Sequence, residues 1–91
     1  MTIRIGNYEF DNVSYDVDGD VLYLHRGAPV AAAETFGTPE GHAVRFDAAG
    51  DVIGLTLVNA KWLVERDGQI TITIPEKIET AGSDLAAALT G

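Results

Sequence analysis

The chain has 91 residues, 46% of them hydrophobic, and carries fourteen Asp and Glu against six Lys and Arg, for a formal net charge of −8. This length predicts one domain, residues 1–91, and the hydrophobic fraction indicates a folded core. The acidic balance disfavours direct binding to nucleic acid or anionic membranes, and the absence of cysteine excludes disulfides and thiolate sites. Neither an apolar leader nor a stretch long enough to span a membrane stands out, so we expect a cytoplasmic protein.

An N-terminal hairpin is predicted by two short alternating segments, Ile3–Ile5 and Tyr8–Phe10, which flank the turn residues Gly6-Asn7. The next turn signal is Asp18-Gly19. A two-residue turn there sets Tyr15 opposite Leu22 and Val13 opposite Leu24, on the side of the ribbon that we expect to face the core.

A near-repeat of this unit follows, because Tyr15–Leu24 is echoed by Phe46–Leu55, each with an aromatic-Asp step, a glycine turn and a strand. A two-residue turn at Ala49-Gly50 pairs Phe46 with Ile53, Val44 with Leu55 and His42 with Leu57. Ala is a weaker first turn residue than Asp. A longer turn with a glycine bulge is therefore the alternative, and it would shift the pairing.

A third hairpin is predicted around Asp67-Gly68, joining Trp62–Arg66 to the strictly alternating Gln69–Ile74. One face then holds Leu63, Ile70, Ile72 and Ile74, and the other holds Trp62, Val64, Thr71 and Thr73. We also expect a short edge strand near Val30–Thr35 and a C-terminal helix over Asp84–Leu89 that Ser83 caps, with Leu85 and Leu89 on one face.

Three aspartates near the first turn, Asp16, Asp18 and Asp20, suggest calcium, but their spacing does not fit an EF-hand loop, which needs Gly at the sixth position and Glu at the twelfth. Polar hairpin tips explain them better. Carboxylates from the two tips, such as Asp16 with Asp47 or Asp20 with Asp51, could act as acid and base only if the hairpins lie side by side.

The two histidines, His25 and His42, lack metal-ligand spacing, and neither Ser14 nor Ser83 sits in a nucleophile motif. We therefore expect no enzyme activity, no cofactor and no metal. Trp62 is typical either of a core or of an interface. We predict an interface formed by Tyr23, Trp62, Val64, Thr71 and Thr73.

Residues 13–60 resemble a known bacterial family through Tyr15-Asp16, Asp20, Leu22-Tyr23-Leu24, Glu34-Thr35, Asp47, Gly50 and Gly54-Leu55-Thr56-Leu57-Val58-Asn59-Ala60. These motifs are similar to the pattern of the domain of unknown function 2283, which runs Tyr-Asp-x-x-x-Asp-x-Leu-Tyr-Ile, then Glu-Thr, then Asp-x-x-Gly-x-x-x-Gly-Ile-Glu-Ile-Leu-x-Ala. Arg45 and Phe46 replace the acid and Tyr that the family often has, and Thr56 replaces its usual Glu. Residues 61–91 lie outside the shared pattern.

The resemblance implies a small β-rich fold with no assigned activity. Because members are sometimes encoded beside small basic toxin-like proteins, it also implies an antitoxin role.

Taken together, the sequence predicts an α+β, mainly β fold: antiparallel hairpins in one sheet or roll, with a short C-terminal helix. We expect a protein-interaction module that self-associates as a homodimer and binds a small basic protein. The alternatives are a small-ligand-binding or metal-binding protein or an enzyme that uses the turn aspartates with His25 and His42, and a structural oligomer without a ligand.

Overall fold

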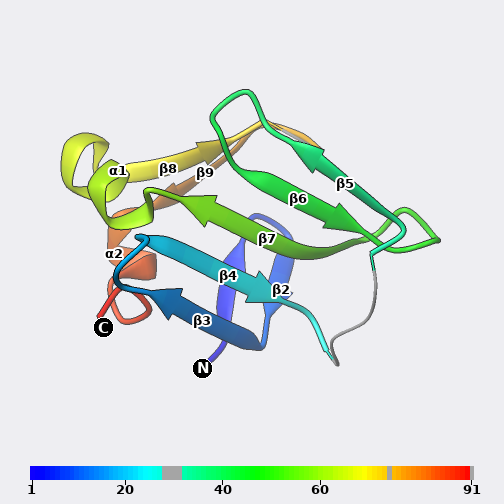
Figure 1. The fold of residues 1–91 in the computed structure, drawn as a ribbon, viewed down its shortest axis with the longest axis horizontal. Helices are drawn as coiled ribbons and strands as arrows, with labels where there is room; N and C mark the ends of the chain where they lie inside the picture. Colours follow the sequence, from blue (N-terminus) through cyan, green and yellow to red (C-terminus); the bar gives the residue numbers. More distant parts are fainter. Residues whose placement is uncertain (28–31, 74, 91) are drawn as a thin grey trace.

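The computed structural model describes residues 1–27, 32–73 and 75–90. A five-stranded antiparallel sheet forms its largest element, with strand order β3-β4-β7-β6-β5 (Figure 1). Its strands are β3 (Asn12–Asp16), β4 (Val21–His25), β5 (Glu34–Gly37), β6 (Ala43–Phe46) and β7 (Val52–Val58). Together with two short helices, this antiparallel sheet confirms the predicted α+β, mainly β class.

The first hairpin of the sheet has the predicted register, with Val13 opposite Leu24 and Tyr15 opposite Leu22. The ladder ends at the pair Asp16 and Val21, so residues 17–20 form the tip. Asp20, the last residue of the tip, adopts the left-handed conformation at φ 53°.

The second hairpin follows the predicted alternative. Val44 pairs with Leu55 as expected, but the register shifts between Arg45 and Phe46, and Phe46 faces Val52 instead of Ile53. Gly50 in the turn has φ 86°, a conformation that glycine adopts without strain. The predicted pair of His42 with Leu57 lies outside the ladder, which begins at Ala43 and Thr56.

The third hairpin was predicted wrongly, because its first strand is a helix. Helix α1 spans Ala60–Asp67 and ends at Gly68, which has φ 75° and donates its N–H to the carbonyl of Val64 at 2.8 Å. Its inward side chains, Ala60, Leu63 and Val64, have the i, i+3, i+4 spacing of a helix face. The strand predicted after Gly68 is present as β8 (Gln69–Ile72), and Ile74 of that prediction lies outside the described residues. β8 pairs with β9 (Ile78–Ala81), a strand that was not predicted.

The remaining elements agree in part with prediction. β1 (Ile3–Ile5) and β2 (Tyr8–Phe10) form the expected N-terminal hairpin. The edge strand β5 begins later than predicted, and residues 30 and 31 of that prediction lie outside the described residues. Helix α2 is shorter than expected, at Gly82–Leu85, and Ser83 lies inside it rather than at its cap.

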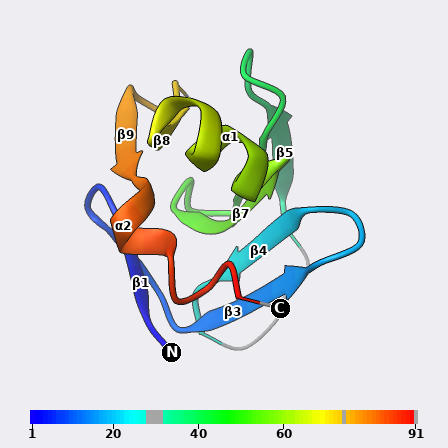
Figure 2. The same cartoon turned by 90° about the vertical axis from the view of Figure 1, so that its left-hand side faces the viewer.

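The core lies on one face of the large sheet, where the β1–β2 hairpin, the β8–β9 hairpin and α2 pack (Figure 2). Buried residues come from all of these elements and include Ile5, Phe10, Leu22, Leu24, Val44, Leu55, Leu57, Ile70, Ile72, Leu85 and Leu89. The opposite face, which we call the open face, is covered by no described helix or strand (Figure 1). None of the described helices is long and apolar enough to cross a membrane.

Candidate functional site

The tip of the β3–β4 hairpin is fixed to the N-terminus of α1 by one residue, Asp20. Its Oδ1 accepts the backbone N–H of Lys61 at 2.8 Å, its Oδ2 accepts that of Trp62 at 3.1 Å, and its carbonyl accepts that of Ala60 at 3.1 Å. The first N–H groups of a helix have no partner within the helix. Asp20 therefore caps α1 from a distant part of the chain, and its negative charge suits the positive end of the helix.

Tyr15 completes this junction, because its hydroxyl donates to Oδ1 of Asp20 at 2.7 Å. That hydrogen bond, together with burial and the negative charges of Asp20, Glu65 and Asp16, raises the pKa of Tyr15 to about 12. Burial alone would raise the pKa of Asp20, but the hydrogen bonds from Tyr15 and from the N–H groups of Lys61 and Trp62 hold it below its ordinary value. The carboxylate is therefore charged and fully engaged at neutral pH.

Beside the junction lies a cavity of about 420 Å³ that we call the Trp62 groove. It is lined by Tyr15, Val17, Asp20, Lys61, Trp62, Glu65 and Leu89. Two apolar side chains here are more exposed than buried, Trp62 at 53% and Val17 at 56%. Exposed apolar side chains that gather in a hollow are typical of a contact surface for another molecule.

The charge around the groove is mainly negative. Of the residues that line the groove, Asp20 of the hairpin tip and Glu65 of α1 are acidic, and Lys61 is the cation. Arg66 lies over the Trp62 ring at 4.6 Å, but its guanidinium is bound by both carboxylate oxygens of Asp67, at 2.9 and 2.7 Å. The local field therefore favours a cationic occupant.

The five residues predicted for an interface do not share one face, because residues 62–66 are helical. Trp62 lines the groove, and Tyr23 lies on the open face with 44% exposure. Val64 is packed against the core, Thr71 lies in β8, and Thr73 donates to the carboxylate of Glu40 at 3.0 Å. Of this set, only Trp62 and Tyr23 are large exposed side chains.

The groups needed for acid–base chemistry are dispersed. The tip of the β3–β4 hairpin lies beyond the pair Val21 and Val58, and the tip of the β6–β7 hairpin lies beyond the pair Phe46 and Val52. Val52 and Val58 are six residues apart along β7. At about 3.3 Å per residue, the tips lie roughly 20 Å apart. Asp16 and Asp20 are thus remote from Asp47 and Asp51, and no three His, Asp or Glu side chains within the described part of the chain form a metal-binding group.

The histidines also lie apart. His25 points to the open face, whereas His42 lines a cavity of about 320 Å³ with Leu63 of α1 and Ile70 of β8 on the core side. Nδ1 of His42 accepts the N–H of Val58 at 3.0 Å, so Nε2 carries the proton in the neutral ring and cannot serve as a metal ligand. Burial lowers the pKa of His42, and the nearby charge of Glu40 opposes this.

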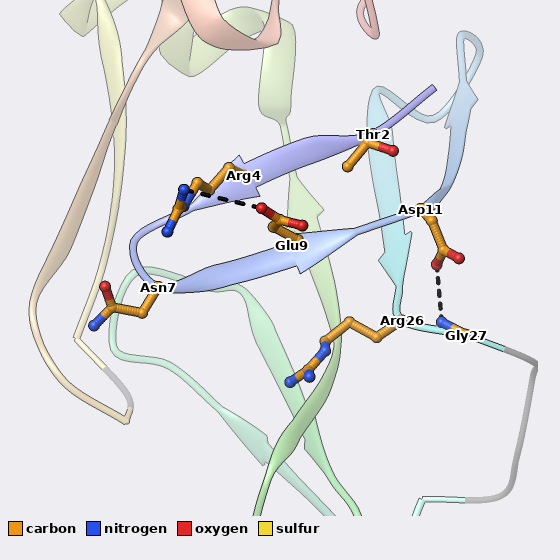
Figure 3. A pocket seen from close by; sticks show the side chains of 7 residues that line it. All are labelled: Thr2, Arg4, Asn7, Glu9, Asp11, Arg26 and Gly27. Carbon is orange, nitrogen blue, oxygen red and sulfur yellow. Dashed lines mark hydrogen bonds and ion pairs between the residues drawn. The ribbon is translucent and has the colours of Figure 1, made fainter.

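Another cavity, of about 430 Å³, lies beside the β1–β2 hairpin (Figure 3). Its charged groups already have partners: Arg4 faces Glu9 at 3.9 Å, and Asp11 accepts the N–H of Gly27 at 2.8 Å (Figure 3). Arg26 donates to the carbonyl of Val52 at 3.0 Å. This hollow offers mostly polar, mutually satisfied groups. The Trp62 groove has the stronger features of a binding site.

Comparison of the chain with protein-family models, curated proteins and solved structures returned no match. Several residues behind the resemblance in residues 13–60 have structural roles. Tyr15 and Asp20 form the junction with α1, and Oδ1 of Asp47 accepts the N–H groups of Ala49 and Asp51 at 2.9 Å around the turn. Gly54 lies beneath the side chain of Arg45.

Sequence reasoning assigned Asp20 to a hairpin tip and missed its role as a cap for α1. The sequence carries no signal for this role, because Asn59, directly before the helix, is itself a residue type that often caps helices. In the structure Asn59 has φ 57° and makes no side-chain capping hydrogen bond, and Asp20 takes that role.

Proposed function

We propose that this protein is an interaction module that binds a basic protein partner in the Trp62 groove. The observation that carries the proposal is that two apolar side chains, Trp62 and Val17, each more than half exposed, line one groove with the carboxylates of Asp20 and Glu65. An apolar segment bearing Lys or Arg residues fits both features. Its apolar side chains would cover Trp62 and Val17, and its cations would meet the carboxylate of Glu65.

The groove is rigid enough for specific recognition, because Asp20 holds its two walls together through α1 and Tyr15. A preformed surface avoids the entropy cost of ordering on binding. Trp is enriched among residues that dominate binding energy, so Trp62 is the expected centre of the contact. The surrounding carboxylates are expected to act mainly on the association rate.

In its sharpest form, the proposal makes the partner a small basic toxin-like protein that this chain neutralises. That form rests on the resemblance of residues 13–60 to the domain of unknown function 2283 and on the net charge of −8. Growth rescue of cells that express a candidate toxin, by the wild-type chain but not by Trp62→Glu, would support it.

The groove can be tested directly, because Trp62 is the only tryptophan of the chain. The probe is a synthetic amphipathic peptide in which helical spacing places Leu on one face and Lys on the other. Poly-lysine serves as the charge-only control. We expect saturable changes in Trp62 fluorescence with the amphipathic peptide, weaker at higher salt, and none at equal concentration with poly-lysine. Tyr23→Ala should bind normally, whereas Val17→Glu should not.

The proposal fails if the two probes bind alike, or if Val17→Glu binds the amphipathic peptide as well as the wild type does. Circular dichroism of each variant checks that the fold is kept.

A further inference from the structure

The side chain of His42 completes the ladder between β6 and β7 at the point where the backbone of β6 turns away. The ladder stops at the pair Ala43 and Thr56, and in the bend before it the N–H of Thr38 donates to the carbonyl of His42 at 2.7 Å. Alternate N–H groups of an antiparallel strand point to the same neighbour, so the N–H of Val58 points toward β6 like that of Thr56. Nδ1 of His42 accepts it at 3.0 Å. An imidazole ring thus replaces a backbone carbonyl at the end of β7.

Helix α1 follows directly on this hydrogen bond, because its first residue, Ala60, comes two positions after Val58 (Figure 1). The helix contributes a wall to two cavities. Leu63 lines the cavity of about 320 Å³ that His42 also lines, whereas Trp62, the residue before it, lines the Trp62 groove. A displacement of the start of α1 would therefore change both the surroundings of His42 and the shape of the groove.

The charged groups that face His42 come from the bend before β6 and from α1. Glu40 of the bend and Arg66 and Asp67 of α1 line the same cavity. Arg66 and Asp67 neutralise each other through their two hydrogen bonds. β7 and β8 carry no charged side chain, and Arg45 of β6 lies on the open face. Among the described residues, Glu40 is therefore the charge that acts on His42.

The two protonation states of His42 need different partners. In the neutral ring Nδ1 has a lone pair for the N–H of Val58, whereas in the protonated ring Nδ1 is itself a donor, and two donors cannot share a hydrogen bond. The ring is only 3% exposed, and Nε2 has no partner among the described residues, so a positive charge in this position would have neither water nor an acceptor. The carboxylate of Glu40, which lines the same cavity, can supply both the acceptor and the opposite charge.

We propose that His42 is an acid-sensitive latch for α1: the neutral ring holds the end of β7 and with it the helix, and the protonated ring releases Val58 and turns toward Glu40. The start of α1 then moves. Because Asp20 binds N–H groups in the first turn of α1, this movement also disturbs the wall of the Trp62 groove and weakens binding there. The loss of binding rests on the proposed function, whereas the release of α1 does not.

Nuclear magnetic resonance of the free protein tests the latch without a partner. Burial lowers the pKa of His42, so the ring nitrogens of His42, the amide of Val58 and the indole of Trp62 should titrate with one shared midpoint below pH 6.5. His42→Gln keeps an acceptor for the N–H of Val58 but takes up no proton, so it should lose this transition. His25→Gln, which replaces the other histidine, is the matched control and should keep it. A Trp62 signal that does not follow His42, or a transition that persists in His42→Gln, would overturn the inference.

Glu40→Gln tests the second position of the ring. It removes the charge that stabilises the protonated form, so the midpoint should move to lower pH. An unchanged midpoint would contradict the turn of His42 toward Glu40.

Binding of the amphipathic Leu and Lys peptide at falling pH tests the coupling to the groove. The affinity of the wild type should fall by up to about tenfold per pH unit below the midpoint, the slope that the uptake of one proton allows, and that of His42→Gln should fall much less. An equal fall in both proteins would overturn the inference. A wild type that binds no peptide at neutral pH would instead refute the proposed function, and the shared midpoint of His42 and Trp62 in the free protein would still decide for or against the latch.

Discussion

Tyr15 and Asp20 share a hydrogen bond of 2.7 Å, and the carboxylate oxygen that accepts it also accepts the N–H of Lys61 at 2.8 Å. One charged oxygen therefore connects an aromatic side chain that packs on the core to the start of a helix about forty residues later in the chain. The other oxygen serves Trp62. This junction shapes the Trp62 groove, and it leads to the first two predictions.

Replacing Asp20 by Ala should destabilise the protein by about 2–3 kcal/mol. The change removes a helix cap and a charge-assisted hydrogen bond from Tyr15, and it leaves Ala in a left-handed conformation. Asp20→Asn should lose less stability than Asp20→Ala, because Asn tolerates the left-handed conformation and keeps one oxygen acceptor. Urea denaturation measures both. The control Asp18→Ala should change the free energy of unfolding by less than about 0.5 kcal/mol.

Tyr15 should ionise at high pH and lower the stability as it does so. Its pKa of about 12 in the folded protein exceeds the ordinary value of 10.0, so the folded state holds the proton more tightly than the unfolded state. The resulting stability is complete below pH 10 and is lost as the pH rises toward 12. Absorbance of the phenolate should reveal a titration near 12 that is missing in Tyr15→Phe; its persistence in that variant would refute the assignment.

His42 should make the protein less stable in mild acid. Burial lowers its pKa below 6.5, so the unfolded state binds the proton more readily, and stability falls as the pH drops from 6.5 toward the pKa of the folded state. Protonation also removes the lone pair that accepts the N–H of Val58. The difference in pH dependence between the wild type and His42→Gln isolates this contribution, and nitrogen chemical shifts of the ring should show a proton on Nε2 and none on Nδ1.

The contact of α1 with α2 predicts a steric coupling. A Cβ atom at Gly82 would overlap Cγ1 of Val64 and lie 3.2 Å from the carbonyl oxygen of Gly68. Gly82→Ala should therefore cost about 1–3 kcal/mol, although Ala favours a helix. Val64→Ala alone also destabilises by loss of packing. The double variant should be destabilised by less than the sum of the two single-variant costs. Strict additivity would show that the two residues do not interact.

The sequence was sufficient to predict the hairpins where the turn residues and the alternation of the flanking segments agree. Gly6-Asn7 and Asp18-Gly19 each lie between alternating segments, and both predicted hairpins formed, the one at Asp18-Gly19 in the predicted register. At Ala49-Gly50 the turn residues leave two solutions, and the choice depends on packing. The bulge at Arg45 and Phe46 settles it in the folded chain.

The main error came from Asp67-Gly68, because an Asp-Gly pair suits a hairpin turn and equally suits the end of a helix. Both need a residue at positive φ, and Gly68 supplies it at 75° as the cap of α1. The spacing of Ala60, Leu63 and Val64 and the helix-forming Lys61 and Glu65 favoured the helix.

Long-range contacts were beyond reach from the sequence. The capping of α1 by Asp20 spans 41 residues to Lys61, and the Trp62 groove needs a hairpin tip, a helix and the C-terminal segment together. Similarly, the uncovered face of the sheet became visible only once the packing side of each hairpin was known. Local patterns predict elements and their apolar sides, but not which elements meet.

The position of Asp20 also bears on the order in which the chain folds. The backbone contacts that start α1 join residues 41 and 42 positions apart, and they exist only after β3 and β4 have paired and turned at their tip. An eight-residue helix is unstable in isolation, so α1 should gain its structure late, at the rate at which the sheet closes. The fluorescence of Trp62, the third residue of that helix, would then report the completion of a sheet to which Trp62 does not itself belong.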